Sequence, residues 1–321
     1  MIEIENLSKS FGLKRAVDDV SFSVERGEVL GFLGPNGAGK STTMRMITGF
    51  IPPSGGSIRV GGHNVQDVPI PAKRLMGYLP ENAPGYADMT VAGFLGFVAE
   101  LRGLGGRARR QAVARVAELC FLEPVLYQTI DTLSKGYKHR TCLAQALIHD
   151  PDILILDEPT DGLDPNQKHE VRNLIRRMGE NKAIIFSTHI LEEVEATCSR
   201  VIIIDRGRIV ANGTPEELKH RSEYAGAVRL CVANGMAGEM TATLGRHPGV
   251  DAIETLEEDA NHVCVRIRPQ RAVAGSAFAR ELGALAVREQ WAVEELHTEE
   301  GRLDDVFRAI TLSDTQTEAR Q

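Results

Sequence analysis

Residues 34–41 read Gly-Pro-Asn-Gly-Ala-Gly-Lys-Ser and directly follow a short apolar run at residues 29–33. Glycines let such a loop fold tightly with its N–H groups turned inward, and a helix that starts at the lysine adds the positive end of its dipole. A strand, this loop and a helix in succession predict a nucleoside triphosphate site in an α/β fold. The alternative is a glycine-rich turn that binds nothing.

Each polar group of this loop has an expected task. Lys40 is expected to reach the β- and γ-phosphates, and the hydroxyl of Ser41 is expected to bind Mg²⁺. The remaining residues that we assign to nucleotide binding at this loop are Gly34, Asn36, Gly37, Gly39 and Thr42.

A second apolar run at residues 153–156 ends in Asp157-Glu158-Pro159. Such a run is typical of a buried parallel strand, and ligands of open α/β sheets bind beyond the carboxyl ends of strands. We therefore expect Asp157 to meet the metal and Glu158 to polarise an attacking water molecule. The alternative is an acidic pair at the surface. Hydrolysis is favoured over binding alone.

Composition narrows the class of protein. A length of 321 residues suggests about two domains. No run approaches the roughly 18 to 20 apolar residues of a membrane span, and the first residues lack a signal-peptide pattern, so we expect a cytoplasmic protein. The five cysteines (Cys120, Cys142, Cys198, Cys231, Cys264) show no Cys-x-x-Cys pair and no histidine at ligand spacing, so we expect buried free thiols.

Charge is uneven along the chain. Residues 222–321 hold 10 basic and 17 acidic side chains, a net charge of −7 that equals the value for the whole chain. A nucleic-acid groove needs clustered cations, so no nucleic-acid partner is expected.

The pattern along the chain predicts two domains, 1–221 and 222–321. In the first, short strands precede the phosphate loop, a helical insertion covers about 82–140, and strands alternate with helices beyond Asp164. In the second, strands are expected at 228–232, 250–256, 262–267 and 286–296, and helices at 236–244, 273–282 and 303–310. That order resembles a small ferredoxin-like α+β domain.

Between the two phosphate-site elements lies Leu133-Ser134-Lys135-Gly136-Tyr137. With this third element, residues 1–220 resemble an ATP-binding-cassette (ABC) ATPase, the nucleotide-binding subunit of an ABC transporter. The resemblance implies a P-loop domain with a mixed sheet core, an antiparallel β subdomain and a helical insertion. It also implies Mg²⁺-dependent ATP hydrolysis by a homodimer or heterodimer, in which Ser134 and Gly136 serve the nucleotide of the opposite subunit.

Further residues match the family in order. The resemblance implies that Phe11 stacks on adenine, that Asp164 belongs to a loop reaching across the dimer, and that His189 contacts the γ-phosphate as part of the catalytic group. Glu81 stands where most members carry a Mg²⁺-contacting glutamine. Tyr137 and His139 also replace glutamines of the usual signature, and for His139 a structural role is favoured over a role in pH response.

Within the family, Glu81-Asn82 and the C-terminal segment 301–307 resemble export-type ATPases, particularly those called gliding-motility-associated. We therefore expect an exporter motor that is peripheral at the inner face of the cell membrane through a separate permease. The alternative is a soluble ABC ATPase of the ribosome or of DNA repair. An apolar stripe (Leu303, Val306, Phe307, Ile310) predicts either a dimer contact or a core helix.

Overall fold

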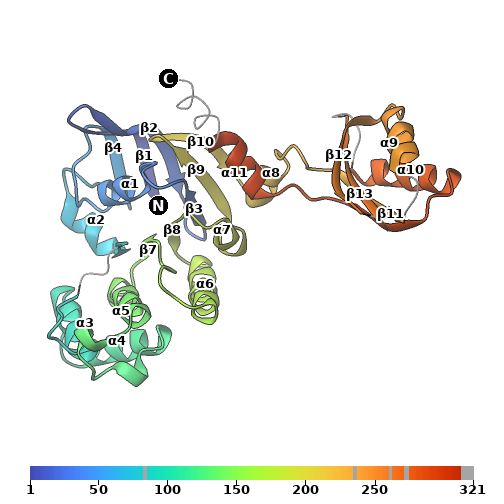
Figure 1. The fold of residues 1–321 in the computed structure, drawn as a ribbon. Helices are drawn as coiled ribbons and strands as arrows, with labels where there is room; N and C mark the ends of the chain where they lie inside the picture. Colours follow the sequence, from blue (N-terminus) through green and yellow to red (C-terminus); the bar gives the residue numbers. More distant parts are fainter. Residues whose placement is uncertain (82–84, 234–236, 260–261, 271–274, 312–321) are drawn as a thin grey trace. The chain divides into compact units, whose positions relative to one another are not determined.

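The computed structural model describes residues 1–81, 85–233, 237–259, 262–270 and 275–311 (Figure 1). The chain divides into two compact units, Met1–Pro215 and Glu216–Gln321. The division falls a few residues before the boundary at 221 that the sequence predicts. Parts of the sequence-based predictions, namely Asn82 with residues 83–84, residue 236 and residues 273–274, lie outside the described ranges.

The central sheet of the first unit has six strands in the order β10-β9-β3-β8-β7-β6. The bounds are β3 Val29–Leu33, β6 Met76–Leu79, β7 Ile153–Asp157, β8 Ala183–Thr188, β9 Arg200–Asp205 and β10 Arg208–Gly213. Neighbours are parallel except β10, which pairs antiparallel with β9. Every residue of β3, β7 and β8 is buried, as expected for strands covered on both faces.

A second, antiparallel sheet has the order β2-β1-β4-β5. Its strands are β1 Ile2–Phe11, β2 Lys14–Val24, β4 Gly55–Val60 and β5 His63–Asn64. Helix α1 (Lys40–Ile47) contributes Met44, Met46 and Ile47 to the core cluster that this sheet forms with the six-stranded sheet. The first turn of α1, and with it the phosphate loop, is therefore fixed by a large apolar core.

Helices complete the first unit (Figure 1). They are α2 Pro69–Leu75, α3 Val91–Leu101, α4 Gly106–Leu119, α5 Lys135–Leu147, α6 Pro165–Gly179 and α7 Leu191–Thr197, with 3₁₀ turns η1 Glu123–Val125 and η2 Ile130–Thr132. Helices α3, α4 and α5 pack on one another and α5 contacts β6, which gives the helical insertion expected from the sequence. Helix α8 (Pro215–Lys219) lies at the boundary between the two units.

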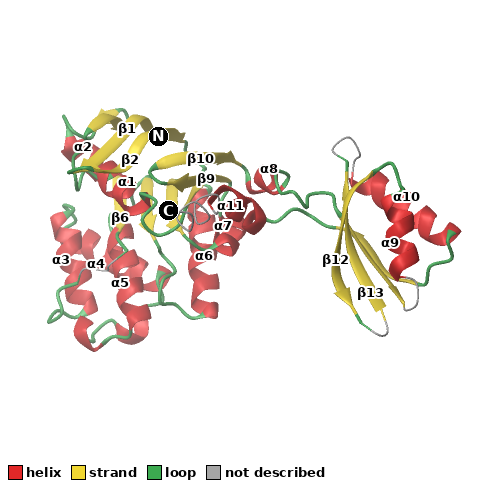
Figure 2. Ribbon diagram, turned by 45° about the horizontal axis from the view of Figure 1, so that its top comes forward, coloured by secondary structure: helices red, strands yellow, loops and turns green. Residues whose placement is uncertain are grey.

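The second unit is a βαββαβ arrangement followed by a helix, in agreement with the ferredoxin-like expectation. The elements are β11 Val228–Ala233, α9 Ala237–Gly245, β12 Val250–Glu258, β13 His262–Pro269, α10 Gly275–Arg288, β14 Val293–Thr298 and α11 Leu303–Thr311. The sheet order is β12-β13-β11-β14, with all neighbours antiparallel. Helices α9 and α10 cover one face of this sheet (Figure 2).

Two sequence-based predictions are wrong in this second unit. Cys231 and Cys264 form a disulfide, because adjacent strands place them directly opposite each other, and wide sequence spacing hides such a pair. The strand expected from residue 286 begins only at Val293, since Leu282, Leu285 and Ala286 continue the buried face of α10. Cys120, Cys142 and Cys198 are buried free thiols, as predicted.

Helix α11 carries the predicted apolar stripe. Leu303 and Val306 are buried, whereas Phe307 and Ile310 are half-buried. Among the described residues, no helix has the length and apolar character that crossing a membrane requires.

Candidate functional site

The phosphate-loop motif lies where β3 ends and α1 begins. A side chain at Gly34 would place its Cβ 2.3 Å from the carbonyl oxygen of Ile204, and one at Gly39 would place it 2.6 Å from that of Ala16. Gly39 also has a φ of 109°, which L side chains rarely adopt. Only glycine fits these two positions, so the loop packs closely against β9 and β2.

Lys40 is the first residue of α1, and only 6% of its surface is exposed. Its Nζ donates hydrogen bonds to the carbonyl oxygens of Gly34 at 2.6 Å and Pro35 at 3.3 Å. Burial lowers the pKa of Lys40, whereas the neighbouring carboxylates of Glu158 and Asp157 act to raise it. The ammonium group and these carboxylates therefore belong to one electrostatic cluster.

Strand β7 ends in Asp157, which lies opposite Ser187 of β8. The hydroxyl of Ser187 donates a hydrogen bond to Asp157 Oδ1. The chain then turns at Glu158, whose φ of 52° lies in the left-handed region, and the Glu158 N–H donates to the Ser187 carbonyl oxygen at 3.0 Å. A non-glycine residue held in this conformation is a feature of functional sites.

The Glu158 carboxylate has a histidine partner. His189 Nδ1 lies 3.0 Å from Glu158 Oε1. Burial raises the pKa of the Glu158 carboxyl, and the hydrogen bond from His189 lowers it. A carboxylate with a raised pKa is a stronger proton acceptor than a solvated one, which suits a general base.

A cavity of about 400 Å³ lies at this junction. Its lining includes most of the predicted site, namely Phe11, Asn36, Gly37, Gly39, Lys40, Ser41, Thr42, Glu81 and Glu158, together with Lys14 and Ala16. Phe11 is 53% exposed at the end of β1, so its ring has a free face for a planar ligand. Five separate parts of the chain therefore contribute to one cavity: β1, β2, the phosphate loop with α1, and the segments that follow β6 and β7.

The residues here also fit a magnesium ion. Asp157 is 1% exposed, and its Oδ2 has no hydrogen-bond partner among the described residues. A buried carboxylate oxygen without a partner is costly unless a donor or cation meets it. Ser41 and Glu81 line the cavity close by. Hydroxyl and carboxylate oxygens are the ligands that Mg²⁺ prefers.

Three predicted residues lie elsewhere. Ser134 caps α5 by accepting a hydrogen bond from the Tyr137 N–H, and Asp164 caps α6 in the same way from the Gln167 N–H. Gly136 of α5 lies against the start of α6, because a Cβ on Gly136 would lie 3.0 Å from Gln167 Oε1. None of Ser134, Gly136 and Asp164 lines the cavity over Lys40, so the structure brings them to each other rather than to the phosphate loop.

The unusual signature residue His139 is buried at 4% exposure. Burial lowers its pKa, and a hydrogen bond with the Pro159 backbone acts in the opposite direction. His139 therefore packs beneath the turn that follows Glu158, which agrees with the structural role favoured from the sequence.

Sequence reasoning missed one buried residue, Glu193 of α7. Its carboxylate accepts hydrogen bonds from Thr160 Oγ1 at 2.6 Å and Thr188 Oγ1 at 3.1 Å, and Lys168 Nζ lies 3.2 Å away. Thr160 follows the Glu158-Pro159 turn and Thr188 precedes His189. Glu193 thus joins the two loops that hold the base and the histidine. The sequence does not distinguish Glu193 from the adjacent Glu192, which is exposed, so it does not predict that Glu193 is buried.

Known proteins resemble this chain. A family model described as "ABC transporter" matches residues 17–161. "Uncharacterized ABC transporter ATP-binding protein YxlF" of Bacillus subtilis (strain 168) is 40% identical over 223 residues, covering 70% of this chain and 74% of that protein. "Nod factor export ATP-binding protein I" of Burkholderia orbicola (strain AU 1054) is 39% identical over 218 residues, covering 68% and 72%.

Among solved structures, one described as "Structure of ATP binding subunit of ABC transporter" aligns with a TM-score of 0.64 at 31% identity, covering 69% of this chain and 92% of that one. Sequence identity over most of the relatives' length and the shared fold agree with the site geometry. The chain therefore belongs to the ABC transporter ATP-binding proteins, and it is a transporter subunit that binds and hydrolyses ATP.

Proposed function

We propose that this chain is the cytoplasmic motor of an exporter and works as a dimer on a separate membrane permease. The observation that carries the proposal is the division of the site into two groups of residues. One group surrounds the cavity over Lys40, and the other (Ser134, Gly136, Asp164) gathers at the starts of α5 and α6. A second copy is required to bring a complete set to one ATP molecule.

In the first group, the loop N–H groups and Lys40 bind the phosphates, and Phe11 stacks on the adenine. Glu158 accepts the proton of the attacking water, while His189 orients the Glu158 carboxylate through their 3.0 Å contact. Ser41, Asp157 and Glu81 would hold Mg²⁺. The ion, when bound, supplies positive charge that stabilises the phosphates during transfer.

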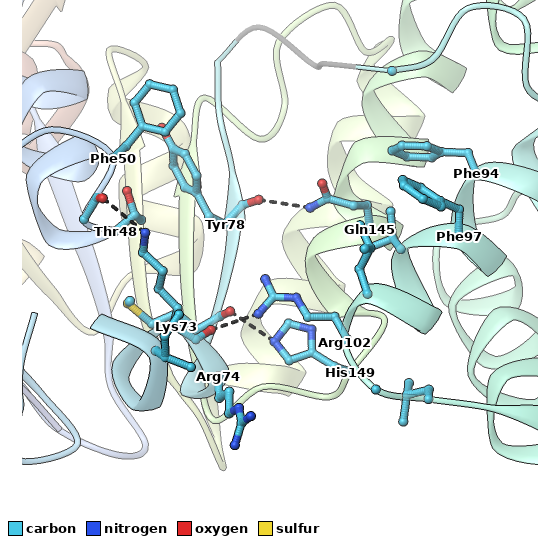
Figure 3. Close-up of a pocket in the computed structure, with 18 of the residues that line it drawn as sticks. Thr48, Phe50, Lys73, Arg74, Tyr78, Phe94, Phe97, Arg102, Gln145 and His149 are labelled. Carbon is cyan, nitrogen blue, oxygen red and sulfur yellow. Dashed lines mark hydrogen bonds between the residues drawn. The ribbon is translucent and has the colours of Figure 1, made fainter. Parts of the chain in front are cut away.

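The permease is proposed to dock in a groove between the helical insertion and the sheets (Figure 3). The groove has a volume of about 1510 Å³. Phe94 and Phe97 of α3 line one side, and Phe50 and Tyr78 line the other. Phe50 and Phe97 are exposed, and apolar side chains gathered in one groove mark an interaction site, into which an amphipathic helix fits.

Charge makes the proposed partner more specific. The groove is lined by the basic residues Lys73, Arg74 and Arg102, and no carboxylate of the described residues lines it. Within the described part of the chain, none of these three basic residues forms a salt bridge. His149 adds no charge at neutral pH, because burial lowers its pKa to about 4. The proposed docking helix of the permease therefore carries apolar side chains beside acidic ones.

The test is affinity purification of tagged Glu158→Gln protein with ATP from native membranes. We expect a multi-spanning protein to copurify in stoichiometric amount. The variant Arg74→Glu should reduce that capture. The control variant Arg110→Glu should not, because Arg110 is an exposed residue of α4 that lies outside the groove. Capture of ribosomes or DNA-repair proteins instead would support the soluble alternative and overturn the exporter proposal.

The export direction is supported by the name of the relative that exports Nod factor. The finer assignment to the gliding-motility-associated type is proposed from Glu81 and the C-terminal segment 301–307. In this proposal the C-terminal unit is an accessory domain that contributes to dimerisation. Truncation after residue 221 should then weaken association of the Glu158→Gln dimer in ATP, as measured by analytical ultracentrifugation.

A further inference from the structure

The four-stranded sheet of the C-terminal unit has two different faces. Val228, Leu230 and Val232 of β11 point into the apolar core with α9 and α10. Cys231, which alternates with them, must lie on the opposite face, where it meets Cys264 of β13. The two Cα atoms are 4.1 Å apart, and the side chains form a disulfide in the centre of the sheet.

Other ligand-type side chains surround this cysteine pair on the same face. Glu295 of β14 lies opposite Cys231, and its Oε2 is 3.3 Å from Cys231 Sγ. His262 precedes Cys264 by two residues, so it shares the Cys264 face, and Glu257 of β12 lies opposite Cys264.

Two triads of potential ligand atoms result. The ligand atoms of Cys231, Cys264 and Glu295 all lie within 4.8 Å of one another, and so do those of Glu257, His262 and Cys264. Cys264 belongs to both triads. Every other ligand atom of the two triads therefore lies within 4.8 Å of Cys264 Sγ, including a carboxylate oxygen from one triad and an imidazole nitrogen from the other.

We propose that the reduced pair Cys231 and Cys264 binds a zinc ion together with His262 and Glu295. Two thiolates, an imidazole and a carboxylate are the donor types of four-coordinate zinc sites. Three strands supply these donors: β11, β13 and β14. A bound ion would therefore join three strands, and binding would stabilise this unit.

His262 already has the neighbours of a metal-binding histidine. Its Nδ1 lies 3.2 Å from Asp259 Oδ2, and its Nε2 lies 3.7 Å from Glu257 Oε2. A carboxylate that accepts a hydrogen bond from the N–H of one ring nitrogen leaves the other nitrogen as a metal ligand. Asp259 has this orienting position, and Nε2 is then the coordinating atom.

Arg229 is a cation beside the proposed ligands, because its guanidinium lies 3.3 Å from both Glu257 and Glu295. A neighbouring cation favours the thiolate over the thiol, which helps metal binding. When zinc takes Glu295, Arg229 keeps Glu257, so the arginine retains a carboxylate partner.

The disulfide and the metal exclude each other. Reduction adds two electrons and two protons to the S–S bond and gives two thiols, and a water-soluble phosphine supplies the electrons as it becomes a phosphine oxide. Zinc then displaces the two thiol protons. Oxidation of the pair removes both sulfur ligands, so zinc occupancy follows the redox state.

The other three cysteines do not compete for the ion. Burial raises the pKa of Cys120 and of Cys142 to about 12, and it also raises the pKa of Cys198. Among the described residues, none of these three belongs to a cluster of potential metal ligands. The expected stoichiometry is therefore one zinc ion per chain.

The experiment uses full-length protein, either disulfide-bonded or reduced with the phosphine and freed of it without oxygen. Zinc affinity is measured by competition with a chromogenic chelator, and Co²⁺ serves as a spectroscopic probe for thiolate ligands. We expect one zinc ion per reduced chain and a thiolate-to-cobalt absorption band. The oxidised protein should bind at least about 10-fold more weakly and show no band.

Cys231→Ser should abolish the cobalt band, and His262→Ala should weaken zinc binding about 10-fold or more. Cys142→Ser is the matched control and should change neither measurement. Equal zinc binding by oxidised and reduced wild-type protein, or absence of the cobalt band on reduction, would overturn the proposal even if a variant failed to fold.

Discussion

The six-stranded and four-stranded sheets place their chemistry at different points along a strand. In the six-stranded sheet, β3, β7 and β8 are buried along their whole length, and Lys40, Glu158 and His189 follow the ends of these strands. In the C-terminal sheet, polar and apolar residues alternate, and the disulfide lies in the middle of β11 and β13. When both faces of a sheet are covered, a ligand can reach the sheet only at the ends of its strands.

The cysteines show the same contrast. Cys120, Cys142 and Cys198 of the first unit are buried, and burial raises the pKa of each thiol. Cys231 and Cys264 lie among charged side chains on a face that α9 and α10 leave uncovered. The five cysteines are all buried, but only Cys231 and Cys264 have potential metal ligands as neighbours among the described residues.

The first prediction has the largest expected effect. It tests whether ATP hydrolysis in the first unit depends on Glu158, which follows the end of β7. Glu158→Gln should lower kcat by about 10²- to 10⁴-fold, because a neutral amide cannot accept the proton of water. The variant should still bind ATP and should accumulate as a dimer, measured by steady-state turnover and size-exclusion chromatography. Glu192→Gln, on exposed α7 surface, is the control. Wild-type turnover in Glu158→Gln would refute the assigned base.

The second prediction tests whether the disulfide stabilises the C-terminal unit. Under oxidising, metal-free conditions, Cys264→Ser should lower the free energy of unfolding by about 3 to 4 kcal/mol, because the bond closes a loop with a sequence separation of 33. Trp291 is the single tryptophan and packs in the core of this unit, so its fluorescence in urea reports the transition. The difference should vanish when both proteins are reduced; a difference that persists would contradict the explanation.

The third prediction tests how the two catalytic loops are joined in the first unit. Glu193→Gln should lower its free energy of unfolding by about 1 to 3 kcal/mol, because Lys168 loses a charged partner and Thr160 and Thr188 lose a charged acceptor. Calorimetry measures the loss, and kcat should fall with it. Glu192→Gln again serves as the control, and equal behaviour of the two variants would show that Glu193 does not join the loops.

The smallest expected effect is a shift in pH dependence. The hydrogen bond from His189 lowers the pKa of Glu158, so His189→Ala should raise that pKa further. The carboxylate form then appears only at higher pH, and the acid limb of the residual single-turnover rate should move upward by up to about one pH unit. An acid limb at its original pH would mean that His189 does not control the Glu158 carboxyl.

The sequence predicted the ATP site more completely than the C-terminal site. Lys40 and Glu158 each belong to a short continuous motif that follows a strand, so local spacing is enough to find them. Glu193 was missed because its partners Thr160 and Thr188 come from two other loops. The Cys231–Cys264 bond was missed because strand register, rather than spacing, decides which cysteines meet.

Local chemistry in the sequence thus determined the phosphate loop, the acidic strand end, the family and the order of elements in the second unit. Only the tertiary structure decided that Ser134, Gly136 and Asp164 gather away from Lys40, and that Cys231 faces Cys264 and Glu295. The physical reason is that a turn brings together residues adjacent in the chain, whereas packing and register bring together residues far apart in it.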